Sequence, residues 1–327
     1  MSVDVAGKKR RILYVSDPII STYPEYGNLF SLLDLTNPSV VEWVISNFIH
    51  IRAHNNVGGT CFNGFTSFKD IWTLQKTCPF LHYYSYPYEM TTGKCYKSLR
   101  KLIVDSVNKG FYIFVYLNRS YITNKEATAS IDHQTLIYGY DLRKKVVLVS
   151  DNLNNGKYKR TEYKIEDVEK AYANLEENRL SEILLFKKSD SCAYKFDVEF
   201  LKRELELYLK PECINIPETV AVNLEVVQFR IDNLEPDVRP FCIFYEHKII
   251  MELRLKYLME KGYLEYDAHL VKKLSLLKER YLVIRNKVVK LNFDDSRNLI
   301  DSIKKDLEDA IQEEFCFMKE LAERLKV

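Results

Sequence analysis

The spacing of apolar positions divides this chain into a mixed first part and a helical second part. Before residue 190, short apolar runs alternate with stretches in which apolar residues recur every three or four positions, as expected for strands mixed with amphipathic helices. After residue 191, the apolar positions follow helical spacing for most of the length. The sequence therefore predicts an α+β domain over residues 1–190, followed by a mainly helical domain over residues 191–327.

The individual elements follow from the same periodicity and from its glycine and proline breaks. In the first domain we expect strands at 12–15, 111–117, 158–164 and 183–187, a hairpin over 134–151, and helices beginning at 28, 40, 68, 95 and 165. In the second domain we expect a helix at 196–209, strands within 219–231, and three long helices at 241–261, 265–290 and 296–325.

The hairpin brings together two polar residues that are separated in sequence. His133 stands where the first strand begins and Asp151 where the second ends, with the turn 142–145 between the strands. Opposed residues of an antiparallel hairpin have nearly constant index sums, so His133 and Asp151 fall close together. A carboxylate in that place can fix the tautomer of the imidazole. The spacing predicts the base and the orienter of a catalytic triad, with Asn152 as the alternative orienter.

Composition narrows the partners and the compartment. The 48 basic and 46 acidic residues leave a formal charge of +2, which gives no support to nucleic-acid binding. The seven cysteines are scattered without a C-x-x-C pair, so we expect reduced thiols rather than a zinc site or disulfides. No apolar run reaches the roughly 20 residues of a membrane span, and no signal-type segment follows the start. We therefore expect a cytoplasmic protein with no membrane partner.

Other polar residues carry weaker indications. His50 and His54 lie four positions apart, as metal ligands on one helix face do, but no carboxylate stands at ligand spacing. This favours a solvated helix end over a metal site. The tyrosine-rich run 83–88 is interpreted as a packed loop, with a groove for an aromatic acyl chain as the alternative. We expect neither a metal nor a bound cofactor.

A series of motifs in the first domain resembles that of a known family. The motif begins with His133-x-x-Leu136-Ile137-Tyr138-Gly139-Tyr140-Asp141 and continues with Val149-Ser150-Asp151, Gly156-Lys157-Tyr158 and Ala171-Tyr172. Over about residues 14–190 the chain is similar to the papain-like fold in its C39-peptidase-like form. Within that fold it resembles the butirosin-biosynthesis-protein-H-like proteins of bacterial natural-product pathways. The resemblance implies that His133 is the general base and Asp151 its orienter.

The same resemblance places a catalytic cysteine at the N-terminus of the first helix, where the helix dipole favours a thiolate. The matching position in this chain is Gly27, which has no side chain. Three explanations stay open: the nucleophile was replaced by design, the chain is a natural pseudoenzyme, or another thiol such as Cys61 takes the role.

The oxyanion hole also departs from the family pattern, because no glutamine precedes position 27 in residues 16–26. We expect the oxyanion to be bound by the backbone N–H of residue 27. A second donor would come from one of four upstream residues: Ser21, Thr22, Tyr23 or Tyr26.

The resemblance implies a thioester-dependent acyltransferase or amide synthase. A cysteine at position 27 would take an acyl group from the phosphopantetheine arm of a carrier protein, and would pass it to an amine with His133 as base. The implied partners are an acyl or peptidyl carrier protein and the amine acceptor. Two other functions remain open: a cysteine peptidase or hydrolase with water as acceptor, and a non-catalytic protein that binds the carrier.

Overall fold

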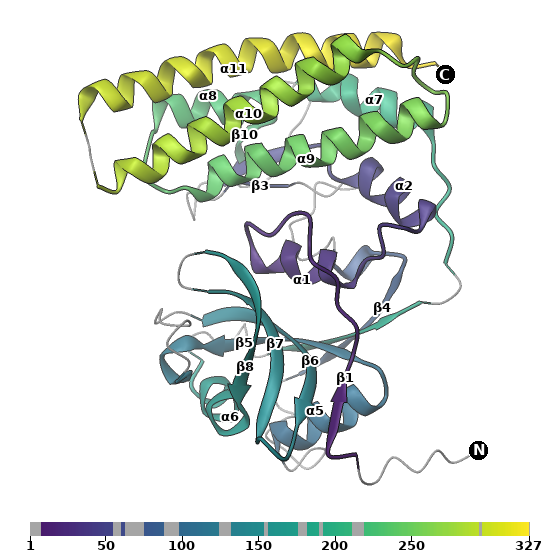
Figure 1. Ribbon diagram of the computed structural model, residues 1–327, viewed down its shortest axis with the longest axis vertical. Helices are drawn as coiled ribbons and strands as arrows, with labels where there is room; N and C mark the ends of the chain where they lie inside the picture. Colours follow the sequence, from purple (N-terminus) through teal and green to yellow (C-terminus); the bar gives the residue numbers. More distant parts are fainter. Residues whose placement is uncertain are drawn as a thin grey trace. The chain divides into compact units, whose positions relative to one another are not determined.

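The computed structural model describes residues 8–54, 60–62, 75–87, 98–123, 132–153, 156–175, 182–189, 192–210, 219–293 and 296–326. They form two compact units, Met1–Asp34 with Gln75–Cys192, and Leu35–Leu74 with Ala193–Val327 (Figure 1). The α+β class is confirmed, since the first unit holds a seven-stranded antiparallel sheet with helices. The second unit contains residues 35–74, which the sequence analysis assigned to the first domain, because α2 and β2 pack within it.

The sheet of the first unit has the strand order β4-β9-β5-β6-β7-β8, with β1 added beside β6. Its strands are β1 (Arg10–Ile12), β4 (Leu81–Tyr86), β5 (Tyr112–Asn118), β6 (Asp132–Asp141), β7 (Val146–Asn152), β8 (Tyr158–Lys164) and β9 (Ile183–Lys188). The hairpin is confirmed as β6 and β7. Its register shifts between Ile137 and Gly139, a bulge where β1 approaches so closely that a β-carbon on Gly139 would lie 2.9 Å from the Arg11 carbonyl oxygen.

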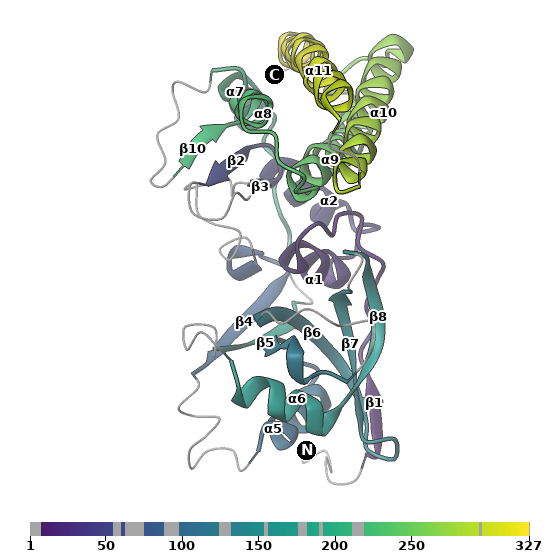
Figure 2. The ribbon, with the colours of Figure 1, turned by 90° about the vertical axis from the view of Figure 1, so that its left-hand side faces the viewer.

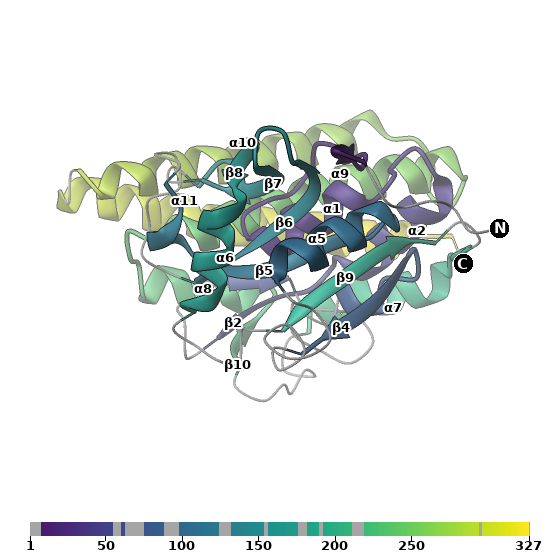
Figure 3. The same cartoon turned by 90° about the horizontal axis from the view of Figure 1, so that it is seen from below.

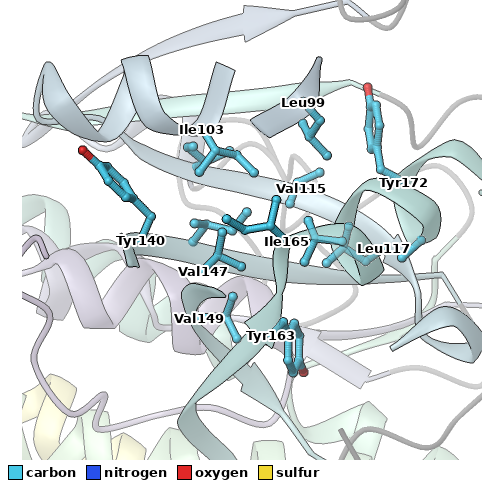
Figure 4. Close-up of a cluster of buried hydrophobic side chains, with 14 of the residues drawn as sticks. Leu99, Ile103, Val115, Leu117, Tyr140, Val147, Val149, Tyr163, Ile165 and Tyr172 are labelled. Carbon is cyan, nitrogen blue, oxygen red and sulfur yellow. The ribbon is translucent and has the colours of Figure 1, made fainter. Parts of the chain in front are cut away.

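Two helices pack on this sheet and complete its apolar core. They are α5 (Leu99–Asn108) and α6 (Ile165–Ala173), which Figure 3 shows in front of the strands. Ile103 of α5 and Ile165 of α6 pack in one buried cluster with Val147 of β7 (Figure 4). Fully burying an aliphatic side chain of this size contributes roughly 1.5–3 kcal/mol. The core therefore holds β5, β6 and β7 in place, and these strands carry the polar residues considered below.

Helix α1 (Pro24–Leu32) begins four residues before the position that its apolar spacing predicted. Pro24 occupies the first position, where the missing N–H costs nothing, and Tyr23 is the extended residue before it. The whole helix is buried, including polar residues such as Glu25 and Asn28. Its first turn lacks an aliphatic stripe, so a search for hydrophobic periodicity found only the second half of the helix.

The second unit combines a small antiparallel sheet with long helices. Its strands are β2 (Ile51–His54), β3 (Thr60–Phe62) and β10 (Thr219–Val222), in the order β10-β2-β3 (Figure 2). Its helices are α2 (Pro38–Asn47), α7 (Val198–Tyr208), α8 (Leu224–Asp232), α9 (Arg239–Glu260), α10 (Ala268–Leu291) and α11 (Arg297–Arg324). The three long helices expected near the end of the chain are confirmed. Within the described residues, no helix has the length and apolar character needed to cross a membrane.

Several local predictions were wrong because long-range pairing overrides local pattern. The tyrosine-rich run, interpreted as a loop, forms strand β4 over residues 81–86 and pairs with β9. Residues 224–232, placed within a stretch of possible strands, form α8 after Asn223, which has a φ of 54°. The helix expected from residue 40 begins two residues earlier, at Pro38, and ends at Asn47, before residue 51 where it was expected to end. The strand expected at 12–15 lies instead at Arg10–Ile12, as β1. Most of the helix expected at 68–76 lies outside the described residues.

A buried charged cluster lies among the helices of the second unit. Glu314 on α11 accepts a hydrogen bond from Nζ of Lys248 on α9 at 2.5 Å. The same carboxylate accepts hydrogen bonds from the hydroxyls of Tyr208 and Tyr281 at 2.6 Å each. Burial lowers the pKa of Lys248, and the nearby Glu314 opposes that shift. A charge buried in this way is tolerated only while its partner is present, so the pair ties α9 to α11.

We predict that Lys248→Met destabilises the protein by about 3–5 kcal/mol, because it leaves the Glu314 carboxylate buried without its cation. The double variant Lys248→Met/Glu314→Gln should be more stable than Lys248→Met alone, since the amide keeps partners for both tyrosine hydroxyls. Urea unfolding of both variants and of the unmodified chain measures these differences. If the single variant unfolds at the same urea concentration as the unmodified chain, the pair does not have this structural role.

Candidate active site

The structure brings His133 and Asp151 together across the β6–β7 hairpin. Nδ1 of His133 lies 2.9 Å from Oδ1 of Asp151, at ion-pair distance. The imidazole side chain keeps 15% of its surface exposed, whereas the Asp151 side chain is fully buried. The carboxylate therefore faces the inner nitrogen of the ring, and Nε2 is the nitrogen that remains for a ligand. This arrangement is the one a general base needs.

Asp151 is held by contacts on both carboxylate oxygens. Besides His133, Oδ1 lies 2.5 Å from Nη2 of Arg119. Oδ2 accepts hydrogen bonds from Oγ1 of Thr135 at 3.0 Å and from the hydroxyl of Tyr163 at 2.9 Å. Burial alone would raise the pKa of Asp151. Contacts with His133, and then with Arg119 and Tyr163, outweigh burial and hold the pKa below its usual value. Asp151 is thus a buried anion in a fixed position.

Arg119 is a residue of the site that sequence reasoning missed. It begins a short 3₁₀ turn, Arg119–Tyr121, directly after β5, and it also donates to the backbone carbonyl of Asn152. Strand β5 pairs with β6 so that Asn118 opposes Asp132, which brings the end of β5 to the start of β6. The sequence did show a basic residue directly after a buried strand. It could not show that this residue pairs with Asp151, because that pairing depends on the order of the strands in the sheet.

Helix α1 lies against the same end of β6. Nδ2 of Asn28 donates to Oε1 of Gln134 at 3.2 Å, which links the neighbour of Gly27 to the neighbour of His133. The backbone N–H of Gly27, however, already donates to the Tyr23 carbonyl at 3.1 Å. Because α1 begins at Pro24, Gly27 lies inside the helix and not at its tip. The expectation that this N–H binds an oxyanion therefore disagrees with the geometry.

The space above Gly27 is filled by the ring of Tyr158, the first residue of β8. A β-carbon built on Gly27 would lie 2.5 Å from one ring carbon of Tyr158 and 2.6 Å from another. The Tyr158 hydroxyl donates to Oδ1 of Asn28 at 2.9 Å and accepts from Oγ of Ser31 at 3.2 Å. Burial raises the pKa of this phenol, so it stays neutral. Glycine at position 27 is thus matched to a tyrosine whose ring occupies the space that a side chain at this position would need.

A second carboxyl group, Glu25, lies near His133 and was also missed. Its Oε1 accepts a hydrogen bond from the hydroxyl of Tyr116 at 3.2 Å, and Nε2 of Gln75 donates to its backbone carbonyl at 2.8 Å. Burial raises the pKa of Glu25, while its own backbone N–H, His133 and Tyr116 lower it, and Asp151 raises it further. Glu25 carried no sequence signal, because an acidic residue in the first turn of a helix is common for dipole reasons alone.

The rival candidates take other roles or fall outside the described part. Asn152 donates to the carbonyls of Ser21 and Gly156, so it secures a loop and does not face the imidazole. The side chain of Cys61 lies outside the described residues, and its backbone belongs to β3 in the second unit. Burial raises the pKa of Cys78 to about 12, which makes that thiol a poor nucleophile.

His50 and His54 do not share a helix face, and the solvated helix end that the sequence favoured is wrong for His50, which is buried. His50 follows α2, and its Nε2 lies 2.9 Å from Oε2 of Glu204, while Nδ1 lies 3.2 Å from Oδ1 of Asn223. His54 belongs to β2, and its side chain lies outside the described residues. In the portion of the chain that the structure describes, no three His, Cys, Asp or Glu side chains gather as a metal site would require.

Comparison with known proteins adds no relative to this picture. No protein-family model matches the chain, and no curated protein sequence matches it. These comparisons therefore supply no function for the site.

We predict that Gly27→Ala destabilises the first unit by about 1–3 kcal/mol, the usual cost of overpacking a filled interior. In a Tyr158→Ala background the same substitution should be neutral or stabilising by up to about 1 kcal/mol, because alanine is the better helix former. Chemical unfolding of the four proteins in this double-mutant cycle gives the coupling between the two positions. Equal effects of Gly27→Ala in both backgrounds would show that Tyr158 does not fill this space.

Proposed function

We propose that the first unit is a papain-like, C39-like domain that transfers an acyl group from a thioester to an amine. The observation that carries the proposal is the His133 imidazole, held by a buried Asp151 that Arg119 anchors. Next to it lies α1, the helix that bears the nucleophile in the family that the sequence resembles. A positioned imidazole of this kind is the usual general base for attack on an acyl carbon.

In this chain the transfer proceeds without an acyl-enzyme on residue 27, because Gly27 has no side chain and Tyr158 occupies the space above it. The amine nitrogen attacks the thioester carbonyl carbon directly, and Nε2 of His133 takes a proton from that nitrogen. The carbon–sulfur bond then breaks, and the imidazolium returns its proton to the departing thiolate. Asp151 stabilises the transient imidazolium through Nδ1.

The substrate we propose is an acyl group held on the phosphopantetheine of an acyl or peptidyl carrier protein, with an amine as acceptor in a natural-product pathway. This partner is inferred from the resemblance of residues 133–158 to the butirosin-H-like family. The scattered cysteines, with no C-x-x-C pair in the sequence, fit a reducing, cytoplasmic location. The pathway class, the partner and the location depend on the resemblance, whereas the roles of His133 and Asp151 depend on the geometry.

A second candidate function is binding without catalysis, as in a pseudoenzyme that holds the acyl carrier. The contact between Tyr158 and Gly27 favours it, because the ring leaves no room for a side-chain nucleophile at position 27. Two further alternatives remain: a covalent route through Cys61, and hydrolysis with water in place of the amine. One experiment distinguishes all of these.

The experiment incubates the purified full-length chain with an acyl N-acetylcysteamine thioester and a primary amine, and follows amide and free thiol by mass spectrometry. We expect amide that depends on the amine, with no acyl group on the intact protein. His133→Ala should lower kcat/KM by about 10²-fold or more, as loss of a general base does.

His82→Ala is the matched control, because it removes an exposed imidazole from β4 of the same unit. It should leave the rate unchanged. An acylated protein would point to a covalent route through a thiol, and thiol release without amide to a hydrolase. Binding without turnover would support the pseudoenzyme, and a full rate in His133→Ala would remove His133 from the mechanism.

A further inference from the structure

The interface between α1 and the sheet is unusually rich in hydrogen-bond acceptors. Oε1 of Gln134 accepts from Asn28 at 3.2 Å and from Nε2 of Gln75 at 3.4 Å. Oε1 of Gln75 is buried and has no hydrogen-bond partner among the described residues. With the Glu25 carboxyl group, several acceptor oxygens therefore surround the first turn of α1. Buried acceptors without donors cost free energy, which a ligand that carries N–H groups would recover.

Solvent reaches this cluster at two residues. Glu25 retains 7% of its surface and the His133 side chain 15%, whereas Asn28, Gln75 and Gln134 retain 2% or less. His133 affects the pKa of Glu25, so the two groups are near each other, and a ligand at the imidazole would lie near this buried carboxyl group. Tyr116, which donates to Glu25, stands opposite Gln134 in the β5–β6 pairing, so the sheet fixes the side from which this carboxyl group is held.

Amide formation from a protonated amine releases two protons from the same nitrogen. The ammonium must first become an amine, and the nitrogen that has attacked the carbonyl carbon must then lose a second proton. His133 can accept only one of them, and it returns that proton to the thiolate. The first proton of an ammonium substrate therefore has to go either to solvent or to a second acceptor beside the imidazole.

We propose that the Glu25 carboxylate, together with the acceptor oxygen of Gln75, binds the ammonium group of the acceptor and takes the first of its two protons. This inference rests on the proposed function, and it names the acceptor class as a primary ammonium rather than a neutral alcohol or amide. The proton then passes from Glu25 to solvent when the product leaves. The second proton follows the His133 route to the departing thiolate.

The surroundings of Glu25 suit this role. Burial raises the pKa of its carboxyl group, which makes the carboxylate a stronger base than an exposed one. The groups that shift its pKa besides burial are its own backbone N–H on α1, Tyr116 on β5, His133 on β6 and Asp151 on β7. The Asp151 charge raises the pKa of Glu25 as well, whereas Tyr116 and His133 oppose the shift. A bound ammonium ion would provide a positive charge beside this carboxylate.

The test titrates the full chain with n-butylammonium chloride and, as the uncharged comparison, with n-butanol, by ligand-observed NMR. We expect saturable binding of n-butylammonium and no saturable binding of n-butanol. The affinity for the ammonium should increase as pH rises through the pKa of Glu25, because the carboxylate is the form that binds it. Glu25→Gln keeps the side-chain shape and should weaken binding at least 10-fold and abolish its pH dependence. Glu166→Gln, at an exposed acidic residue in the first turn of α6, is the matched control and should bind as the unmodified chain does.

Absence of saturable ammonium binding, or equal binding by Glu25→Gln, would overturn the inference. The pH dependence in the unmodified chain tests it without any variant. Ammonium binding without amide formation would contradict the proposed function and leave this subsite standing. Amide formation with an unchanged KM for the amine in Glu25→Gln would support the proposed function and contradict the ammonium subsite.

Discussion

The buried carboxylate of Asp151 is the constraint on which the first unit's site depends. A charge at a fully buried position is tolerated only with compensating partners, and here these come from two strands and a turn: Arg119, His133, Thr135 and Tyr163. Satisfying one anion therefore aligns the end of β5 with β6, β7 and β8. The same contact holds the imidazole at the open end of the hairpin, so stability and chemistry depend on one interaction.

Helix α1 adds the second constraint. Its polar side chains contact Gln134 and Tyr158 on the sheet, and Gly27 lets the Tyr158 ring approach the helix backbone. In the function we propose, this packing lies at the position where the resembled family carries its thiol. In that proposal His133 is the base and Asp151 its orienter, and position 27 offers no side-chain nucleophile. Direct attack by an amine on a thioester is the acyl transfer we propose for this site.

Local patterns predicted those parts of the molecule that are set by nearby residues. The β6–β7 hairpin, β8 and the long helices α9, α10 and α11 follow from periodicity and turn residues, and index arithmetic alone placed His133 near Asp151. Arg119, Glu25 and Tyr158 could not be found in this way, because their partners come from strand order and from the approach of α1. Residues 35–74 were wrongly assigned to the first domain for the same reason, since β2 finds its partner β10 far along the chain.

The most direct test of the account is the tautomer of His133, measured by long-range ¹H–¹⁵N NMR on histidine-labelled protein, with the signal assigned through His133→Gln. For the neutral form of the imidazole, the account predicts a proton on Nδ1, facing Asp151, and a lone pair on Nε2. In Asp151→Asn that preference should weaken. A neutral ring with its proton on Nε2 in the unmodified chain would contradict the claim that Asp151 orients a general base.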